Sequence, residues 1–454
     1  MAQVVDVGQL LDEQPFGWGQ IRIILLCFLM LFLDGIDNQG ISYVAPALSK
    51  AWGLERGTLG PVFTAGVAGV ALGALIVGPL ADWFGRRPVV IGTVAYFSVL
   101  TLAVAQATSL NELMVLRFLA GLGLGIVVPM AVVVSSEFAP RRMRGTMVTL
   151  ASCGYAIGAA SGGQLAAVII PIYGWPSVFY VGGIAPLFLV VAMLMWLPES
   201  VRLMAMRPGN DARIARTLAG VNPALAFASD TQFTVTERPN KEFRVLQLLT
   251  DGRIAMTLLL WAIFFMNTTV LNFLNNWLPT LVNTIGLPQE QALRVASTLQ
   301  FGGVIGVISM GMLADRFGFF RVLATAFVVG SVFVGLIGSV GPSVYLLIAV
   351  IAVAGYCNVG CQITNAAMTA TLYPTNIRST GVNWAHGVAR VLSTVGPYLG
   401  GVLLMRDWPP QDILYIFAVP LFVASGLILA LSAVVKSGAA TGAEPAGVAV
   451  AKGS

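Results

Sequence analysis

Two carboxylates stand three residues apart in an apolar stretch of the chain, Asp34 and Asp37 in FLDGIDNQG. Helical neighbours recur every three or four residues, so Asp34, Asp37 and Asn38 are expected on one helical face. Each ionised carboxylate costs about 2.5 to 3.5 kcal/mol at the centre of a membrane helix, even on the mildest insertion scale. Desolvation and mutual repulsion favour reversible protonation of at least one aspartate. The alternative is a fixed ion pair with Arg117 or Arg390.

A second candidate group lies near the end of the chain, in another apolar run. Arg390 is about ten residues into that run, roughly 15 Å along a helix and near the middle of a ~30 Å membrane core. A guanidinium there needs an anionic partner, which a bidentate substrate carboxylate supplies as well as a permanent aspartate does. Asn383 and His386 share its helical face. His386, the only histidine, either binds a substrate hydroxyl or second carboxylate, changes charge near neutral pH, or packs as a neutral side chain.

The elements that position these residues follow from composition. Hydrophobic residues make up 57% of 454 positions, charged residues 10%, and the mean hydropathy is +0.85. Such a chain is an integral membrane protein, and its apolar runs do not alternate as barrel strands do, so it is all-α. Division at the loops predicts twelve transmembrane helices, at roughly 20–46, 58–80, 88–107, 112–137, 147–170, 177–197, 254–280, 291–313, 321–340, 343–371, 380–404 and 412–435.

The densest polar sequence divides these helices into two blocks of six. We expect an N-terminal six-helix bundle over 1–197, a cytoplasmic linker over 198–253, a C-terminal six-helix bundle over 254–435, and a disordered Ala- and Gly-rich tail over 436–454. The four cysteines all fall within apolar spans, so no disulfide framework is expected.

Lysine and arginine decide the orientation. With both termini in the cytoplasm, the external loops keep only Lys50, Arg56, Arg294 and Arg406, whereas eight basic residues lie between Arg202 and Arg253 alone. This asymmetry follows the positive-inside rule. The net charge of +5 therefore sets membrane topology, and no nucleic-acid partner is expected.

The two blocks are related by an internal repeat. GPLADWFGRRP at Gly78–Pro88 aligns with GMLADRFGFFR at Gly311–Arg321 at an offset of 233 residues, and Pro46 aligns with Pro279 at the same offset. Parallel repeats of six helices are typical of carriers that work by alternating access around a central site.

Polar side chains in several of the predicted helices are candidates for the lining of such a site. The repeat register places Asn267 opposite Asp34, so the second block has an amide where the first has an acid. These side chains either line a cavity or make hydrogen bonds between helices. The candidates for substrate binding, beside Arg390, His386 and Asn38, are Tyr155, Gln164, Asn272, Asn276, Asn358 and Gln362.

Four motifs resemble signatures of the major facilitator superfamily. They are GPLADWFGRRP, RFLAGLGLG from Arg117, SEFAPRRMRG and LPESVR. The resemblance implies the twelve-helix facilitator fold and a charge cluster on the inward side that holds one conformation. Arg117 fits either a coupling role or an interfacial anchor that partly snorkels. The residues to which the resemblance gives a role in conformational gating are Asp82, Arg86, Arg117, Glu137, Arg144 and Asp315.

The second copy of the loop differs from the first. It has Phe319 and Phe320 where the first has Arg86 and Arg87. We therefore expect a stronger lock in the amino-terminal half, where the lock is the charge cluster that holds one conformation.

A closer resemblance comes from FLDGID read together with RSTGVNWAHGVARVLSTVGPYLGG, Arg378–Gly401. Both stretches resemble the aromatic acid/proton symporter family of the same superfamily. His386 departs from the family, whose members usually have an apolar residue there. The resemblance implies uptake of a small aromatic carboxylate, such as a hydroxybenzoate, with protons across the bacterial cytoplasmic membrane, by a protein expected to be a monomer in the lipid bilayer.

Two rival functions are weighed against this one. A proton-coupled sugar or drug carrier of the same superfamily is the nearer, because LPESVR is close to a sugar-porter signature, but a central Arg390 favours an anion. An integral membrane enzyme or receptor is further away. No metal-ligand cluster or nucleophile–base pair is visible, so we expect no catalytic residue, metal or cofactor. Of the two acids we favour Asp37 as the proton carrier, for its deeper position.

Overall fold

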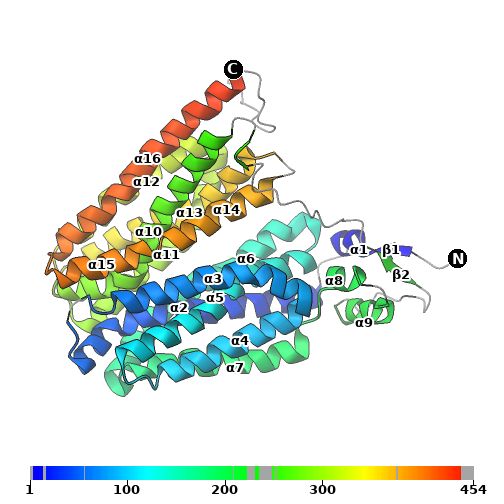
Figure 1. Ribbon diagram of the computed structural model, residues 1–454, viewed down its shortest axis with the longest axis horizontal. Helices are drawn as coiled ribbons and strands as arrows, with labels where there is room; N and C mark the ends of the chain where they lie inside the picture. Colours follow the sequence, from blue (N-terminus) through cyan, green and yellow to red (C-terminus); the bar gives the residue numbers. More distant parts are fainter. Residues whose placement is uncertain are drawn as a thin grey trace. The chain divides into compact units, whose positions relative to one another are not determined.

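The computed structural model describes residues 4–13, 17–55, 57–207, 209–221, 227, 231–234, 248–250, 253–374 and 377–440. Nearly all of this chain is helical (Figure 1). The long helices are α2 (Trp18–Trp52), α3 (Gly60–Phe84), α4 (Arg86–Val104), α5 (Leu110–Phe138), α6 (Arg144–Tyr173), α7 (Pro176–Trp196), α10 (Ile254–Thr284), α11 (Gln289–Phe317), α12 (Phe319–Ile337), α13 (Val344–Leu372), α14 (Arg378–Leu392), α15 (Val395–Met405) and α16 (Pro410–Ala440). The short elements are β1 (Val4–Asp6), α1 (Val7–Glu13), the 3₁₀ turn η1 (Arg141–Met143), α8 (Val201–Ala205), α9 (Asp211–Val221) and β2 (Gln232–Thr234).

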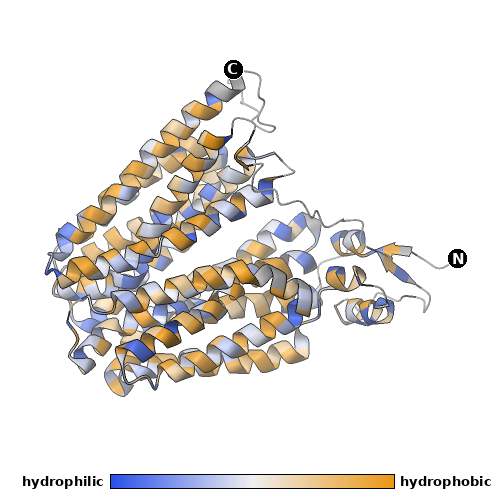
Figure 2. Cartoon of the chain, viewed as in Figure 1, coloured by the Kyte–Doolittle hydropathy of each residue, from blue (hydrophilic) through white to orange (hydrophobic). Residues whose placement is uncertain are grey.

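The long helices are apolar along most of their length (Figure 2). Within the described residues, eleven helical segments are long and apolar enough to cross a membrane, with Thr380–Met405 taken as one of them. The shorter apolar segment Gly60–Ile76 in α3 makes a twelfth. The prediction of an all-α fold with twelve membrane helices is confirmed. Residues 436–440 of the predicted tail belong to α16, and residues 441–454 lie outside the described chain.

The span predicted over 380–404 is broken into α14 and α15 at Ser393 and Thr394. The Ser393 hydroxyl donates to the Arg390 carbonyl at 2.9 Å and accepts from Asn272 Nδ2 at 2.8 Å. A serine hydroxyl that binds its own backbone competes with the helical hydrogen bonds. Pro397 has no N–H to offer the carbonyl one turn earlier, so the sequence allows the break.

The backbone repeats the register found in the sequence. Gly85 and Gly318, 233 residues apart, both have positive φ, 97° and 86°, and each separates two helices. Helices α4 and α12, which follow them, are each 19 residues long. Glycine suits these junctions because other residues rarely adopt positive φ.

Contacts divide the chain into two compact units. Unit 1 comprises residues 1–38, 65–159 and 176–241, and unit 2 comprises residues 39–64, 160–175 and 242–454. In unit 1, α4 packs against α5 and α7. In unit 2, α11 packs against α13, and α12 packs against α13 and α16.

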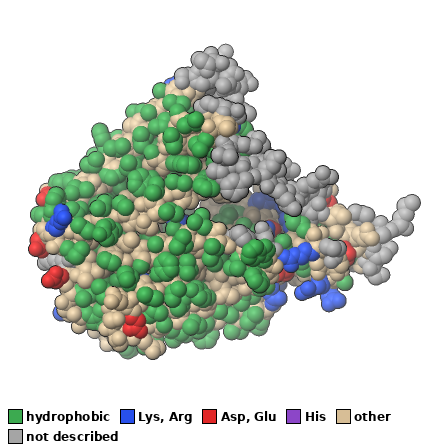
Figure 3. All heavy atoms as spheres, viewed as in Figure 1, with side chains coloured by type: hydrophobic (Ala, Val, Ile, Leu, Met, Phe, Trp, Pro, Cys, Tyr) green, Lys and Arg blue, Asp and Glu red, His purple; other side chains and the backbone are tan. Residues whose placement is uncertain are grey.

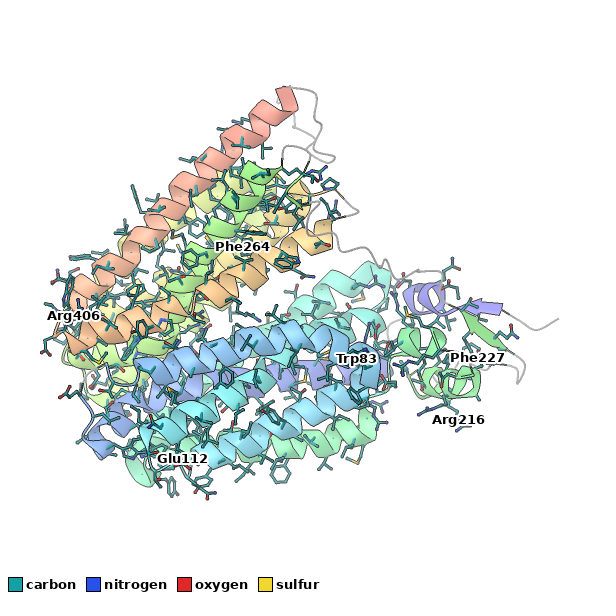
Figure 4. The ribbon with its side chains drawn as sticks, viewed as in Figure 1. Trp83, Glu112, Arg216, Phe227, Phe264 and Arg406 are labelled. Atoms are coloured by element: carbon teal, nitrogen blue, oxygen red, sulfur yellow. The ribbon has the colours of Figure 1, made fainter. Side chains whose placement is uncertain are left out.

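Unit 1 carries a small module that the sequence did not predict. Strand β1 pairs in parallel with β2, with Val5 opposite Phe233, beside α1, α8 and α9 (Figure 1). Phe227 meets Phe233 edge to face at 5.1 Å between ring centroids, and Figure 4 labels it there. The apolar side chains buried in this module are Val7, Leu11, Ile214, Leu218, Val221 and Phe233.

The residues before the first membrane helix are therefore folded together with the linker. In the space-filling view, Lys and Arg side chains gather beside this module, whereas hydrophobic side chains cover much of the visible face of the long helices (Figure 3). We call this end of unit 1 the linker edge, since α8 and α9 belong to the predicted linker.

Candidate functional site

A cluster of charged side chains is buried inside unit 1. Asp34 and Asp37 are 1% exposed, and Arg117 is 3% exposed. Arg117 Nη1 lies 3.8 Å from Asp37 Oδ1, and the Thr101 hydroxyl donates to the same oxygen at 3.0 Å. The guanidinium carbon of Arg117 is 4.4 Å from the centroid of the Phe179 ring. Helices α4 and α5 thus each place one side chain beside Asp37 of α2, and α7 supplies the ring that contacts Arg117.

The pair formed by Asp37 and Arg117 has unused hydrogen-bonding capacity. Asp37 Oδ2 and Arg117 Nε and Nη2 are buried, and none has a hydrogen-bond partner in the described part of the chain. Buried charges are expensive unless their remaining lone pairs and protons are satisfied. Arg117, one of the two arginines predicted as partners, lies beside Asp37.

The other acid of the FLDGID motif, Asp34, lies where α2 and α6 approach closely. A Cβ on Gly35 would stand 2.2 Å from the Tyr155 carbonyl oxygen and 2.8 Å from Ala159 N, so the glycine permits the contact. The Tyr155 side chain is half-buried, as is Asn38. Asp34, buried beside Gly35, is therefore placed by the packing of α2 on α6.

Charged side chains from the predicted gating set meet at the linker edge. Arg86 forms an ion pair with Glu137. Glu199 Oε1 accepts from the backbone N–H groups of Arg86 at 2.9 Å and Arg87 at 3.2 Å, so a carboxylate caps the start of α4. The backbone of Asp82 lies in α3, but its side chain is outside the described residues.

Arg144, another member of the predicted gating set, forms an ion pair at the same edge. Its guanidinium pairs with Asp12, and Asp12 Oδ1 is also 3.7 Å from Arg202 Nη2. Asp12 was not among the predicted residues, because it precedes the first apolar run and nothing local marks it. Asp315, the counterpart of Asp82 in the second repeat, is exposed.

In unit 2, amide side chains of α10 and α13 form a hydrogen-bonded group. Asn267 Nδ2 donates to Gln362 Oε1 at 2.7 Å and to the Asn358 carbonyl at 3.4 Å. Gln362 Nε2 donates to the Thr268 hydroxyl at 3.3 Å. Asn267 and Asn358 are fully buried and Gln362 is half-buried. The amide residues that the second repeat has in place of acids thus lie inside unit 2.

Three other predicted cavity residues are engaged by neighbouring helices or by their own. Asn272 Nδ2 donates to Ser393, as described above, and Asn276 Nδ2 donates to the Asn272 carbonyl at 2.7 Å. Gln164 Nε2 donates to the Ser297 hydroxyl at 2.8 Å. For Asn272 and Gln164 the structure shows hydrogen bonds to another helix or its end, the alternative that the sequence left open, whereas the Asn276 bond lies within α10.

Aromatic side chains surround the face of α14 that carries His386. The imidazole meets the ring of Phe264 edge to face at 4.6 Å, and Figure 4 marks Phe264 on α10. The indoles of Trp261 and Trp384 are stacked at 6.4 Å between centroids. Arg390, half-buried, lies one helical turn beyond His386. Aromatic side chains near a guanidinium are groups that contact a flat, anionic aromatic ring favourably.

A largely helical chain with two six-helix repeats, and with charged and amide side chains buried in its apolar helices, belongs to the class of membrane carriers. The protein-family model described as "Major Facilitator Superfamily" matches residues 27–310 and 291–452. The chain belongs to this superfamily. It is a multi-pass membrane transporter, and the prediction that it is not an enzyme is confirmed.

The relatives agree with the motifs. The chain is 38% identical to the 4-hydroxybenzoate transporter PcaK of Pseudomonas putida over 423 residues, 93% of this chain and 94% of that protein. It is 37% identical to the gallate transporter of Pseudomonas putida, over 94% of this chain and 95% of that protein. A solved D-xylose-proton symporter shares the fold, with a TM-score of 0.68 at 18% identity, over 90% of this chain and 97% of that one. The resemblance to aromatic acid carriers is confirmed.

Proposed function

We propose that this protein takes up a small aromatic carboxylate together with protons. Two of its relatives bear the names of 4-hydroxybenzoate and gallate transporters, and both compounds are benzoates with ring hydroxyls. The observation that carries the coupling is the buried pair of Asp37 and Arg117, which no hydrogen bond joins.

Asp37 is the proton carrier in this proposal. An ionised Asp37 attracts Arg117 across 3.8 Å. A proton that enters the site binds one carboxylate oxygen and removes that attraction, so α2 and α5 are free to shift locally. When the proton leaves, the attraction returns. Asp34 lies one helical turn away and modulates the same equilibrium through its charge.

Arg390 is the residue that binds the carboxylate. A guanidinium offers two parallel N–H groups to a carboxylate, a geometry that Lys does not provide. The His386 ring, one helical turn from Arg390, meets the Phe264 ring, and the two rings give an aromatic substrate a surface on which to pack. A neutral sugar has neither a carboxylate for the guanidinium nor an aromatic ring for this surface, so an aromatic anion is favoured as the substrate over a sugar.

We place the protein in the bacterial cytoplasmic membrane as a monomer, with the linker edge of unit 1 in the cytoplasm. Arg86, Arg144 and Arg202 all lie at that edge, as the positive-inside rule requires. Cysteine labelling of residues near Asp12 from either side of a sealed membrane tests this orientation.

Uptake by purified protein in liposomes tests the substrate class. Wild type should take up radiolabelled 4-hydroxybenzoate, excess unlabelled benzoates should inhibit, and excess xylose should not. Arg390→Ala should lose most of this uptake, whereas Arg406→Ala, at an exposed arginine after α15, should keep it. Full uptake by Arg390→Ala, or inhibition by xylose alone, would remove the proposal.

A further inference from the structure

The buried amide Asn267 has an oxygen that accepts no hydrogen bond from the described residues. Its side chain is fully buried in unit 2, and its Oδ1 has no hydrogen-bond partner among the described residues. Its Nδ2 is already engaged by Gln362 and the Asn358 carbonyl. Buried acceptors are almost always paired, so an acceptor of this kind suits a donor that is not among the described residues, such as a ligand hydroxyl.

The same polar group has one further acceptor without a partner among the described residues, and one more exposed member. Asn358 Oδ1 is also buried without a partner in the described chain. Gln362 is half-buried and shares its hydrogen bonds with Asn267 and Thr268, of which Thr268 is 9% exposed. Access of a ligand to Asn267 requires the Gln362 side chain to rotate, which breaks its hydrogen bonds to Asn267 and Thr268. Oxygen acceptors select a group that donates, such as a hydroxyl.

The position of Asn267 suits one part of an aromatic substrate. It lies three residues after Phe264 on α10, about 4.5 Å along the axis. The Phe264 ring contacts His386, which is one turn from Arg390 on α14. Along these residues a cation, an aromatic surface and a hydroxyl acceptor follow one another within unit 2.

We propose that Asn267 is a specificity-determining residue that accepts a hydrogen bond, through Oδ1, from a ring hydroxyl remote from the substrate carboxylate. The assignment rests on the proposed function, because it needs an aromatic carboxylate on Arg390. A hydroxyl at position 4 donates to Oδ1. Unsubstituted benzoate leaves Oδ1 unpaired. In 2-hydroxybenzoate the hydroxyl donates to the carboxylate of the same molecule, so it is not available to Oδ1. A site built to bind a hydroxyl discriminates against the analogue that lacks it.

The experiment compares kcat/KM for uptake of benzoate, 2-hydroxybenzoate and 4-hydroxybenzoate by liposomes that contain wild type or Asn267→Leu. The substitution should lower kcat/KM for 4-hydroxybenzoate about tenfold, as expected for one buried hydrogen bond. Benzoate and 2-hydroxybenzoate should change little. Asn283→Leu is the matched control, since Asn283 lies near the end of the same helix and donates to the Leu287 carbonyl.

The outcomes separate the two proposals. If Asn267→Leu does not reach the membrane, Asn267→Ser tests the same ratio of rates. An equal loss for all three compounds, or an unchanged ratio, would overturn the role of Asn267 and leave the proposed function standing. A wild-type protein that takes up none of the three would overturn both.

Discussion

Arg117 and Asp37 face each other at 3.8 Å inside unit 1 without a hydrogen bond between them. The oxygen of Asp37 that is nearest to Arg117 instead accepts from the Thr101 hydroxyl at 3.0 Å. The guanidinium is held over the Phe179 ring. The two charges therefore attract each other, but opening the pair breaks no donor–acceptor contact between them, which suits an element that must switch.

The pair makes a prediction about stability. Arg117→Gln should lower the free energy of unfolding by roughly 3 to 5 kcal/mol, because it leaves the Asp37 carboxylate buried without a cation. The double variant Arg117→Gln/Asp37→Asn should recover most of that loss. Thermal unfolding of the three proteins in one detergent measures this. A double variant no more stable than Arg117→Gln would show that the two charges do not interact.

The paired glycines of the repeat predict unequal effects. Gly85 and Gly318 share a positive φ, so an alanine at either costs about 1 to 3 kcal/mol of backbone strain. At Gly85 the new Cβ also stands 2.8 Å from Glu199 Oε2, whereas at Gly318 nothing lies within 4 Å. Gly85→Ala should therefore reduce thermal stability and uptake more than Gly318→Ala. Equal losses would argue against a stronger lock in the first repeat.

Close packing in unit 2 gives a third prediction. A Cβ on Gly401 would lie 2.9 Å from the Gly57 carbonyl oxygen and 2.9 Å from Gly60 Cα. Gly401→Ala should separate α15 from residues 57–60 and slow initial uptake several-fold. Gly426→Ala is the control, since nothing lies within 4 Å of its added Cβ and alanine favours the helix. Equal rates in the two variants would contradict the importance of this contact.

The sequence predicted the membrane helices because hydropathy is a local property of each apolar run. The internal repeat could also be recognised in the sequence, because Gly85 and Gly318 each need a conformation that few other residues adopt. The module at the linker edge was not predicted. Its elements are short, and they are held by distant partners, as when Arg144 binds Asp12, 132 residues away. Hydrophobic periodicity carries no information about such pairs.

The site was predicted in part for the same reason. The spacing of Asp34 and Asp37 marked a shared helical face, and Arg117 was one of two partners considered. Thr101 and Phe179 were not predicted, because a threonine or phenylalanine within an apolar run is unremarkable until the packing of its helix is known. For Asn272 the sequence left a cavity position and an interhelical hydrogen bond open, and the identity of its partner, Ser393 at the break between α14 and α15, depends on packing that the sequence does not show.

The measurement that tests the coupling most directly is uptake of 4-hydroxybenzoate into liposomes that contain Asp37→Asn, with and without an inward pH gradient. Wild type, and the control Asp412→Asn at an exposed residue of α16, should accumulate the substrate above its external concentration only when the gradient is present. Asp37→Asn should bring it to equilibrium but not above, with or without the gradient. Gradient-driven accumulation by Asp37→Asn at the wild-type level would contradict the account.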